Sequence, residues 1–212
     1  MSLDRRTTIK WMLAAAATVP SLTALAYASQ PLARDVKTGQ AGYGTDPDLT
    51  KEWRPGGPWP LTLGVAGRLT TAALCDLIIP ADDISPAASS VGVVDFIDEW
   101  ISAPYPQQRA DRDIILPGLT WIEAEAQGRF GKAFPALTDT QRAAIADAIC
   151  SEKKAAPNAA TAARFFARFR DLTAGGFYTT PVGMKDIGYV GNVPLEKFDG
   201  PPPEVLKKLG LA

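Results

Sequence analysis

The sequence predicts an all-α protein in which about five helices pack in one bundle-like domain. Apolar residues recur at spacings of three and four in several segments, which is the period of a helix that buries one face. No segment alternates apolar and polar residues between turn signals, as a half-buried strand would. We therefore predict a helical body (68–176) between an extended Gly/Pro-rich arm (29–67) and a Gly/Pro-rich tail (177–212), preceded by a leader (1–28).

The leader has the three zones of an export signal. A basic segment contains Arg5, Arg6 and Lys10, an apolar run covers residues 11–19, and small residues follow up to Ala28. Adjacent arginines followed by a lysine are typical of a twin-arginine signal, which the twin-arginine translocase reads. This predicts a protein that folds before export and works in the periplasm. The alternatives are an ordinary secretory signal with two chance arginines, and an uncleaved anchor, for which the run is short of the roughly 20 residues that span a bilayer.

The arm is rich in glycine and proline, which block long helices and strands. It nevertheless contains Tyr43, Trp53 and Trp59, whereas flexible linkers are poor in aromatic residues. We interpret the arm as an extended segment that lies along a surface, either of its own body or of a partner. A disordered start of the mature protein is the alternative.

The residues that stop helices, such as proline and glycine, indicate where the first three helices of the body end. One is expected from Leu69 to Ile79, where Pro80 stops it, and a second from residue 91 to residue 102. A third is expected to begin at Asp111 or Asp113 and to end at the glycines that follow Gln127. Pro117 lies inside this third segment, so the helix either starts near residue 116 or is kinked.

Two further helices complete the body. Thr138 and Gln141 have the spacing of a capping box, which predicts a helix that begins there. The last helix, residues 160–173, carries a stripe of phenylalanines and is expected to stop at Gly175-Gly176. In the tail, residues 204–209 predict one short amphipathic helix.

Composition excludes most kinds of active site. The chain has no histidine, so it cannot form a Ser-His-Asp or Cys-His site, or a His-ligated zinc or haem site. It has no glycine-rich dinucleotide or phosphate-binding motif. Its 22 basic and 23 acidic residues give no excess of positive charge for nucleic acid. We therefore predict no catalytic, cofactor-binding or metal-binding residue in this chain.

Two groups of acidic residues have other interpretations. Asp95, Asp98 and Glu99 would share one helix face, where paired carboxylates can do acid–base chemistry, but we interpret them as a solvated face. Asp82 and Asp83 follow Pro80 in a loop, and their spacing matches no calcium-binding loop. Aspartates in loops usually form turns, so we do not expect them to bind a metal.

The two cysteines, Cys75 and Cys150, lie in segments that we expect to be helical. An even number of cysteines in an exported protein is compatible with one disulfide. The alternative is two unpaired thiols that pack as small apolar groups. A disulfide cannot be required for folding if the protein folds in the reducing cytoplasm before export.

The most distinctive segment of the tail extends from Gly175 to Asn192, where Tyr178 and Tyr189 stand among many glycines. Tyrosines give large, rigid contact areas that suit an interface. Packing of the tail onto its own helices is the alternative. With the aromatic residues of the arm, this gives a predicted partner interface consisting of Tyr43, Trp53, Trp59, Tyr178 and Tyr189.

Several of these segments resemble the gluconate 2-dehydrogenase subunit 3 family. The likeness rests on Leu74–Asp82, Val93–Asp98, Phe177–Thr179 and Gly183–Asn192, and it covers roughly residues 69–192. The run Gly183–Asn192 is similar to the branch that is associated with glycoside 3-dehydrogenases.

The resemblance implies a small subunit that is not an enzyme by itself. In this family the partner is a large flavoprotein of the glucose–methanol–choline class, which holds FAD and the catalytic histidine, and a multihaem cytochrome c often completes the complex. The small subunit helps the leaderless partner to mature and carries it through the twin-arginine pathway to the periplasm. There the complex associates the small subunit with the membrane. A free-standing periplasmic helical binding protein is the alternative function.

Overall fold

The computed structural model of the protein describes residues 54–189, 191, 197 and 200–211. All regular structure in these residues is helical, which confirms the all-α prediction. The predicted leader and most of the arm lie outside them, and so do the predicted functional residues Arg5, Arg6, Lys10, Tyr43 and Trp53.

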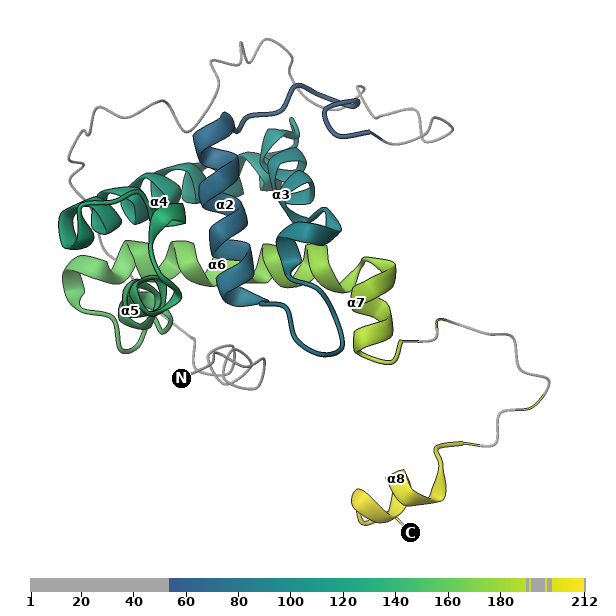
Figure 1. Cartoon of the computed structure of the whole chain (residues 1–212). Coiled ribbons are helices and arrows are strands. Elements are labelled where there is room, and N and C mark those ends of the chain that lie inside the picture. Colours follow the sequence, from purple (N-terminus) through teal and green to yellow (C-terminus); the bar gives the residue numbers. More distant parts are fainter. Residues whose placement is uncertain (1–53, 190, 192–196, 198–199, 212) are drawn as a thin grey trace.

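Five helices form the body, as predicted (Figure 1). Their bounds are α2 Val65–Ile78, α3 Val93–Ser102, α4 Pro106–Phe130, α5 Asp139–Ile149 and α6 Ala160–Tyr178. Three short 3₁₀ helices lie in the connections, namely η1 Ala88–Val91, η2 Phe134–Ala136 and η3 Pro157–Ala159. In Figure 1 α2 crosses over the long helix α6, and each of the five helices places buried apolar side chains in one common core.

Phenylalanine and branched aliphatic residues fill this core, which explains why the helices are amphipathic. The largest fully buried side chains include Leu74, Ile78, Ile97, Ile101, Ile115, Leu119, Phe165, Phe166, Phe169 and Phe177. Burying one such side chain contributes about 1.5–3 kcal/mol relative to leaving it exposed. The core therefore supplies the main force that holds the five helices together.

Helix α4 begins earlier than the sequence predicted. It starts at Pro106 after the cap residue Tyr105, rather than at Asp111 or Asp113. Proline suits the first helical position because its φ angle is already helical and an N–H is not needed there. Pro117 stays inside the helix at an exposed position, where water can reach the backbone carbonyl that its missing N–H leaves unbonded. The predicted end is confirmed, since Gly131 caps the helix with a left-handed φ of 65°.

The predicted capping box is present at the start of α5. Thr138 Oγ1 accepts the backbone N–H of Gln141 at 3.3 Å, and Gln141 Oε1 accepts the N–H of Thr138 at 3.0 Å. Helix α5 thus begins at the residue that the capping-box spacing in the sequence predicted.

The prediction that Gly175 and Gly176 end the last body helix was wrong. Helix α6 continues through them to Tyr178, and a further helix, α7 (Pro181–Asp186), follows after Thr180 caps its first turn. Gly176 is buried against α3, so its place in the helix is set by a tertiary contact and not by helix termination. The short helix that was predicted at 204–209 is present as α8 (Pro203–Lys208).

The described helices include none that is long and apolar enough to cross a membrane.

Both cysteines are unpaired in the structure, as in the second of the two alternatives, and no disulfide joins Cys75 to Cys150. Cys75 is fully buried on α2, and its Sγ lies 3.7 Å from Thr173 Oγ1 on α6. Cys150 follows α5, and its Sγ points to the carbonyl of Asp147. Burial raises the pKa of the Cys75 thiol to about 12, which keeps it protonated and unreactive.

Candidate functional site

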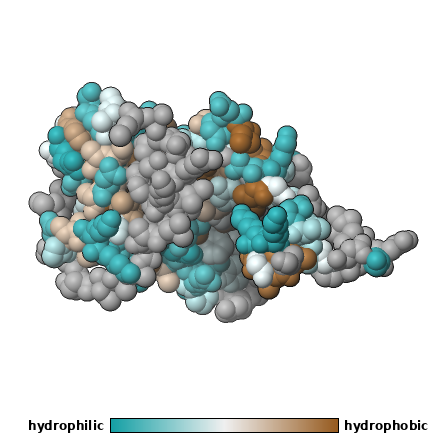
Figure 2. Space-filling view, turned by 90° about the horizontal axis from the view of Figure 1, so that it is seen from below, coloured by the Kyte–Doolittle hydropathy of each residue, from teal (hydrophilic) through white to brown (hydrophobic). Residues whose placement is uncertain are grey.

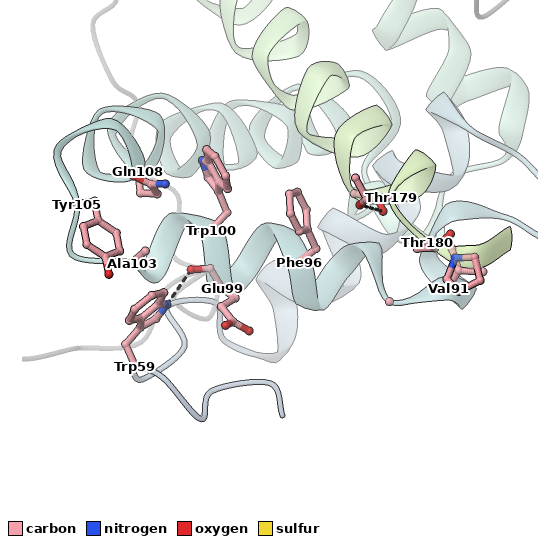
Figure 3. A pocket seen from close by; sticks show the side chains of 13 residues that line it. Trp59, Val91, Phe96, Glu99, Trp100, Ala103, Tyr105, Gln108, Thr179 and Thr180 are labelled. Atoms are coloured by element: carbon pink, nitrogen blue, oxygen red, sulfur yellow. Dashed lines mark hydrogen bonds between the residues drawn. The ribbon is translucent and has the colours of Figure 1, made fainter. Parts of the chain in front are cut away.

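A groove of about 710 Å³ lies where α3, the start of α4 and the junction of α6 with α7 meet (Figure 3). Its size is in the range of sites that hold a small molecule or a few side chains of a partner. The lining is mostly apolar and aromatic, and its main side chains are Trp59, Val91, Phe96, Trp100, Tyr105 and Pro181.

Trp59 forms one end of the groove and is firmly held. Its indole Nε1 donates to the backbone carbonyl of Glu99 at 3.0 Å. Its ring meets Tyr105 edge to face, with the ring centroids 5.7 Å apart. Figure 3 shows Trp59 and Tyr105 together at the end of α3, away from Thr179 and Thr180.

Trp100 forms the middle of the groove, beside Phe96. The two side chains are one turn apart on α3, and their centroids are 5.9 Å apart. Behind Trp100, Asp111 Oδ2 accepts the indole N–H at 2.8 Å. Arg168 of α6 donates to both oxygens of Asp111, at 2.6 and 2.5 Å. The aromatic wall is therefore fixed by a buried polar network.

Gly176 lets α6 approach this wall closely. A Cβ atom at Gly176 would lie 2.7 Å from Cδ1 of Phe96 and 3.3 Å from Cγ1 of Val93. Any larger residue would push Phe96 away from α6. A position that looked like a helix stop in the sequence is in fact part of the groove's base.

The interpretation of Asp95, Asp98 and Glu99 as a solvated face was wrong for Asp98. Its side chain has no solvent exposure, because the end of the arm folds back over this part of α3. It accepts hydrogen bonds from two backbone N–H groups of the arm and from Arg68, which also pairs with Asp95. Asp98 and Asp95 thus take part in a structural contact with the arm and Arg68.

Asp82, in the loop after α2, forms a turn, as predicted. Its Oδ1 accepts the backbone N–H groups of Ile84 and Ser85, each at 2.9 Å. No group of three or more residues of the metal-ligating types comes together in the described part of the chain.

The predicted interface residues occupy three different environments. Trp59 lines the groove. Tyr178 is only partly exposed and packs edge to face on Phe177, so it covers part of the hydrophobic core. Tyr189 is 56% exposed and lies beyond α7. The sequence analysis missed Phe96 and Tyr105 as groove residues, although the spacing of Phe96 and Trp100 on one helix face was visible.

Exposed apolar side chains gather beside α7. The hydroxyl of Ser85 contacts Asp186 at 3.1 Å, which ties the loop after α2 to the end of α7. Ile84 and Ile187, the chain neighbours of these two residues, are 78% and 58% exposed. Figure 2 shows separate hydrophobic patches among hydrophilic residues on one face of the molecule. Such surface is typical of a contact region.

Asp111 should make stability depend on pH. Burial disfavours its charge, but the hydrogen bonds from Arg168 and Trp100 and the charge of Arg168 outweigh this and lower its pKa. A lowered folded-state pKa stabilises the protein above the ordinary value of about 3.9, and this contribution disappears as pH falls through the folded-state pKa. Asp111→Asn should therefore cost about 1–3 kcal/mol at pH 7 and progressively less at an acidic pH below the ordinary value, as measured by urea unfolding.

The exposed carboxylate of Asp139, which pairs with Arg142, provides the control for this prediction. Asp139 is 89% exposed and lies 3.4 Å from Arg142, so Asp139→Asn should change stability little at either pH. Equal losses for Asp111→Asn at both pH values would show that its charge does not stabilise the fold.

The side chains that line the groove indicate what kind of occupant it suits. Its lining has one carboxylate, that of Glu99, and one carboxamide, that of Gln108, and the other side chains present rings, aliphatic groups and hydroxyls. The N–H groups of both of its indoles are directed to protein acceptors, so the groove offers ring faces to an occupant. This favours apolar side chains as the occupant and a role in binding.

A protein-family model described as gluconate 2-dehydrogenase subunit 3 matches residues 67–200, which is more than half of the chain. The match includes all of α2 except its first two residues, the helices α3 to α7, and all the groove residues except Trp59. No curated protein and no solved structure gives a significant match.

Proposed function

The chain belongs to the gluconate 2-dehydrogenase subunit 3 family, and from this we propose that it is the non-catalytic small subunit of a periplasmic, FAD-dependent sugar or glycoside dehydrogenase. Its role is to stabilise the large flavoprotein subunit and to escort it through the twin-arginine pathway. The family match is the observation that carries this proposal.

The sequence and the groove support the division of labour between the two subunits. Oxidation of a sugar alcohol needs a base to take the hydroxyl proton, and histidine is the commonest such base. The chain has no histidine, and its groove is lined mainly by aromatic and aliphatic groups. We therefore assign the proton transfer, the FAD and the substrate to the large subunit.

The all-α fold also supports the proposal that the large subunit, and not this chain, binds the FAD. Dinucleotides are commonly bound where a parallel sheet meets the N-termini of helices. The described part of this chain is a helical body without strands. We propose that the small subunit contacts the flavoprotein through Trp59 at the groove and through the tail near Tyr189. A cytochrome c subunit that accepts the electrons is part of the same proposal.

Co-purification tests this function. With an affinity tag after Ala212, the full chain should retain a yellow flavoprotein that oxidises a sugar or glycoside with an artificial electron acceptor. Trp59→Ala and Tyr189→Ala should each weaken retention roughly 30-fold, the effect of losing an interface hot spot. Leu69→Ala is the matched control, because Leu69 is also 56% exposed but lies on α2, outside both contact segments.

A chain that purifies alone, as a stable monomer, from cells that express the flavoprotein would contradict the proposal. That result would favour a free-standing helical binding protein instead. Equal retention by all three variants would show that the interface lies elsewhere on the subunit.

A further inference from the structure

The end of the arm is fixed to one turn of α3. The backbone N–H of Thr62 lies 3.0 Å from Asp98 Oδ1 and 2.8 Å from Ser102 Oγ. The N–H of Leu63 donates to the same oxygen of Asp98 at 2.9 Å. Two consecutive backbone groups of the arm therefore depend on one carboxylate.

Asp98 is well suited to hold them. The charge of a fully buried carboxylate must be compensated, and here Oδ2 accepts Nη1 of Arg68 at 2.9 Å. Hydrogen bonds to a charged acceptor are stronger than those between neutral groups. Without this acceptor, the buried N–H of Leu63 would lose its partner, and that of Thr62 would keep only Ser102 Oγ. A conformation in which the arm leaves α3 and water binds these groups would then be favoured.

The contact has a consequence for the groove. Trp59 lies only three residues before Thr62, and its indole bonds to the carbonyl of Glu99, next to Asp98 on α3. If the arm left α3, Trp59 would leave with it, and the groove would lose one end. Tyr105 would lose its ring partner at the same time.

We propose that Asp98 is a positioning residue for partner binding: it holds the arm on α3 and thereby keeps Trp59 at the groove. This inference rests on the proposed function, since the partner is the large subunit. It assigns a role in assembly to a residue that touches neither the groove nor the partner. The side chains that line the groove are held in place before the partner binds, so little conformational entropy is lost on binding.

Amide hydrogen exchange of the full chain tests the arm contact without any partner. In Asp98→Ala, exchange at Thr62 and Leu63 should accelerate about tenfold or more, as expected when a stabilising hydrogen-bond acceptor is lost. Asp95→Asn is the matched control. Asp95 lies one turn earlier on α3 and pairs with the same Arg68, yet it is 30% exposed, and exchange at Thr62 and Leu63 should stay within about twofold of wild type.

Co-purification with the flavoprotein then tests the effect on assembly. Asp98→Ala should lower retention about as much as Trp59→Ala, and Asp95→Asn should leave it unchanged. Unchanged exchange in folded Asp98→Ala would overturn the proposal. Fast exchange together with full retention would also overturn it, because the arm would be free and the partner still bound.

A second variant covers the case in which Asp98→Ala does not fold. Asp98→Asn keeps the size and one oxygen of the side chain but removes the charge that strengthens its hydrogen bonds to Thr62 and Leu63. It should accelerate exchange at both residues and lower retention, and unchanged values in both would overturn the proposal. If the wild-type chain retains no flavoprotein, the proposed function fails, while the exchange data still decide whether Asp98 holds the arm.

Discussion

Gly118→Ala should destabilise the protein by at least about 3 kcal/mol, the upper end of the usual cost of overpacking a core. Gly118 lies in the middle of α4, where this helix packs on α6. A Cβ atom there would be 1.9 Å from Cδ2 and 2.0 Å from Cγ of Phe165. These ring atoms cannot move aside easily, because Phe165 is 1% exposed and packs on Phe169. Since typical domains are stable by only about 5–15 kcal/mol, this change should be plain in urea unfolding.

The same helix offers a matched control for this substitution. Gly128 is also a helical glycine of α4, but a Cβ atom there would meet no atom within 4 Å. Gly128→Ala should stabilise the protein by about 0.5–1 kcal/mol, because alanine loses less backbone freedom on folding. A Gly118→Ala protein with wild-type stability would show that α4 and α6 are not packed this closely.

Arg5→Lys combined with Arg6→Lys should abolish export of the dehydrogenase. In this double variant, periplasmic activity should fall roughly tenfold or more, while active flavoprotein accumulates in the cytoplasm. The charge of the leader stays the same, so an ordinary secretory signal would tolerate the change, whereas a receptor that reads the arginine pair would not. Activity in separated periplasmic and cytoplasmic fractions is the measurement.

A conservative change outside the leader controls for the substitution itself. Arg34→Lys, in the arm, makes the same replacement and should leave both fractions at wild-type activity. Wild-type periplasmic activity in the double variant would contradict the export role. It would leave the assembly role to be decided by co-purification.

Features that depend on neighbours in the sequence were predictable. The capping box of Thr138 and Gln141 and the glycine cap after α4 are set by local hydrogen bonds and backbone geometry, so the sequence placed both ends correctly. The five body helices were predictable because each repeats apolar residues at helical spacing. The family was also recognisable from short runs of sequence.

Features that depend on distant parts of the chain were not predictable. Gly176 resembles a helix stop, but its contact with Phe96 keeps it inside α6. Asp98 has the spacing of a surface residue, and only the returning arm buries it. The groove joins Trp59 to residues of η1, α3, α4, α6 and α7, and one sequence does not show which of its helices will meet.

The described fold forms without a disulfide, because Cys75 and Cys150 are both unpaired. Cys75 is sealed between α2 and α6 as a protonated thiol, and no described helix is joined to another by sulfur. The same core can therefore form among the reductants of the cytoplasm and persist in an oxidising compartment, with no chemical step between the two. The escort role that we propose requires this property, because the subunit would bind its partner before export and stay bound afterwards.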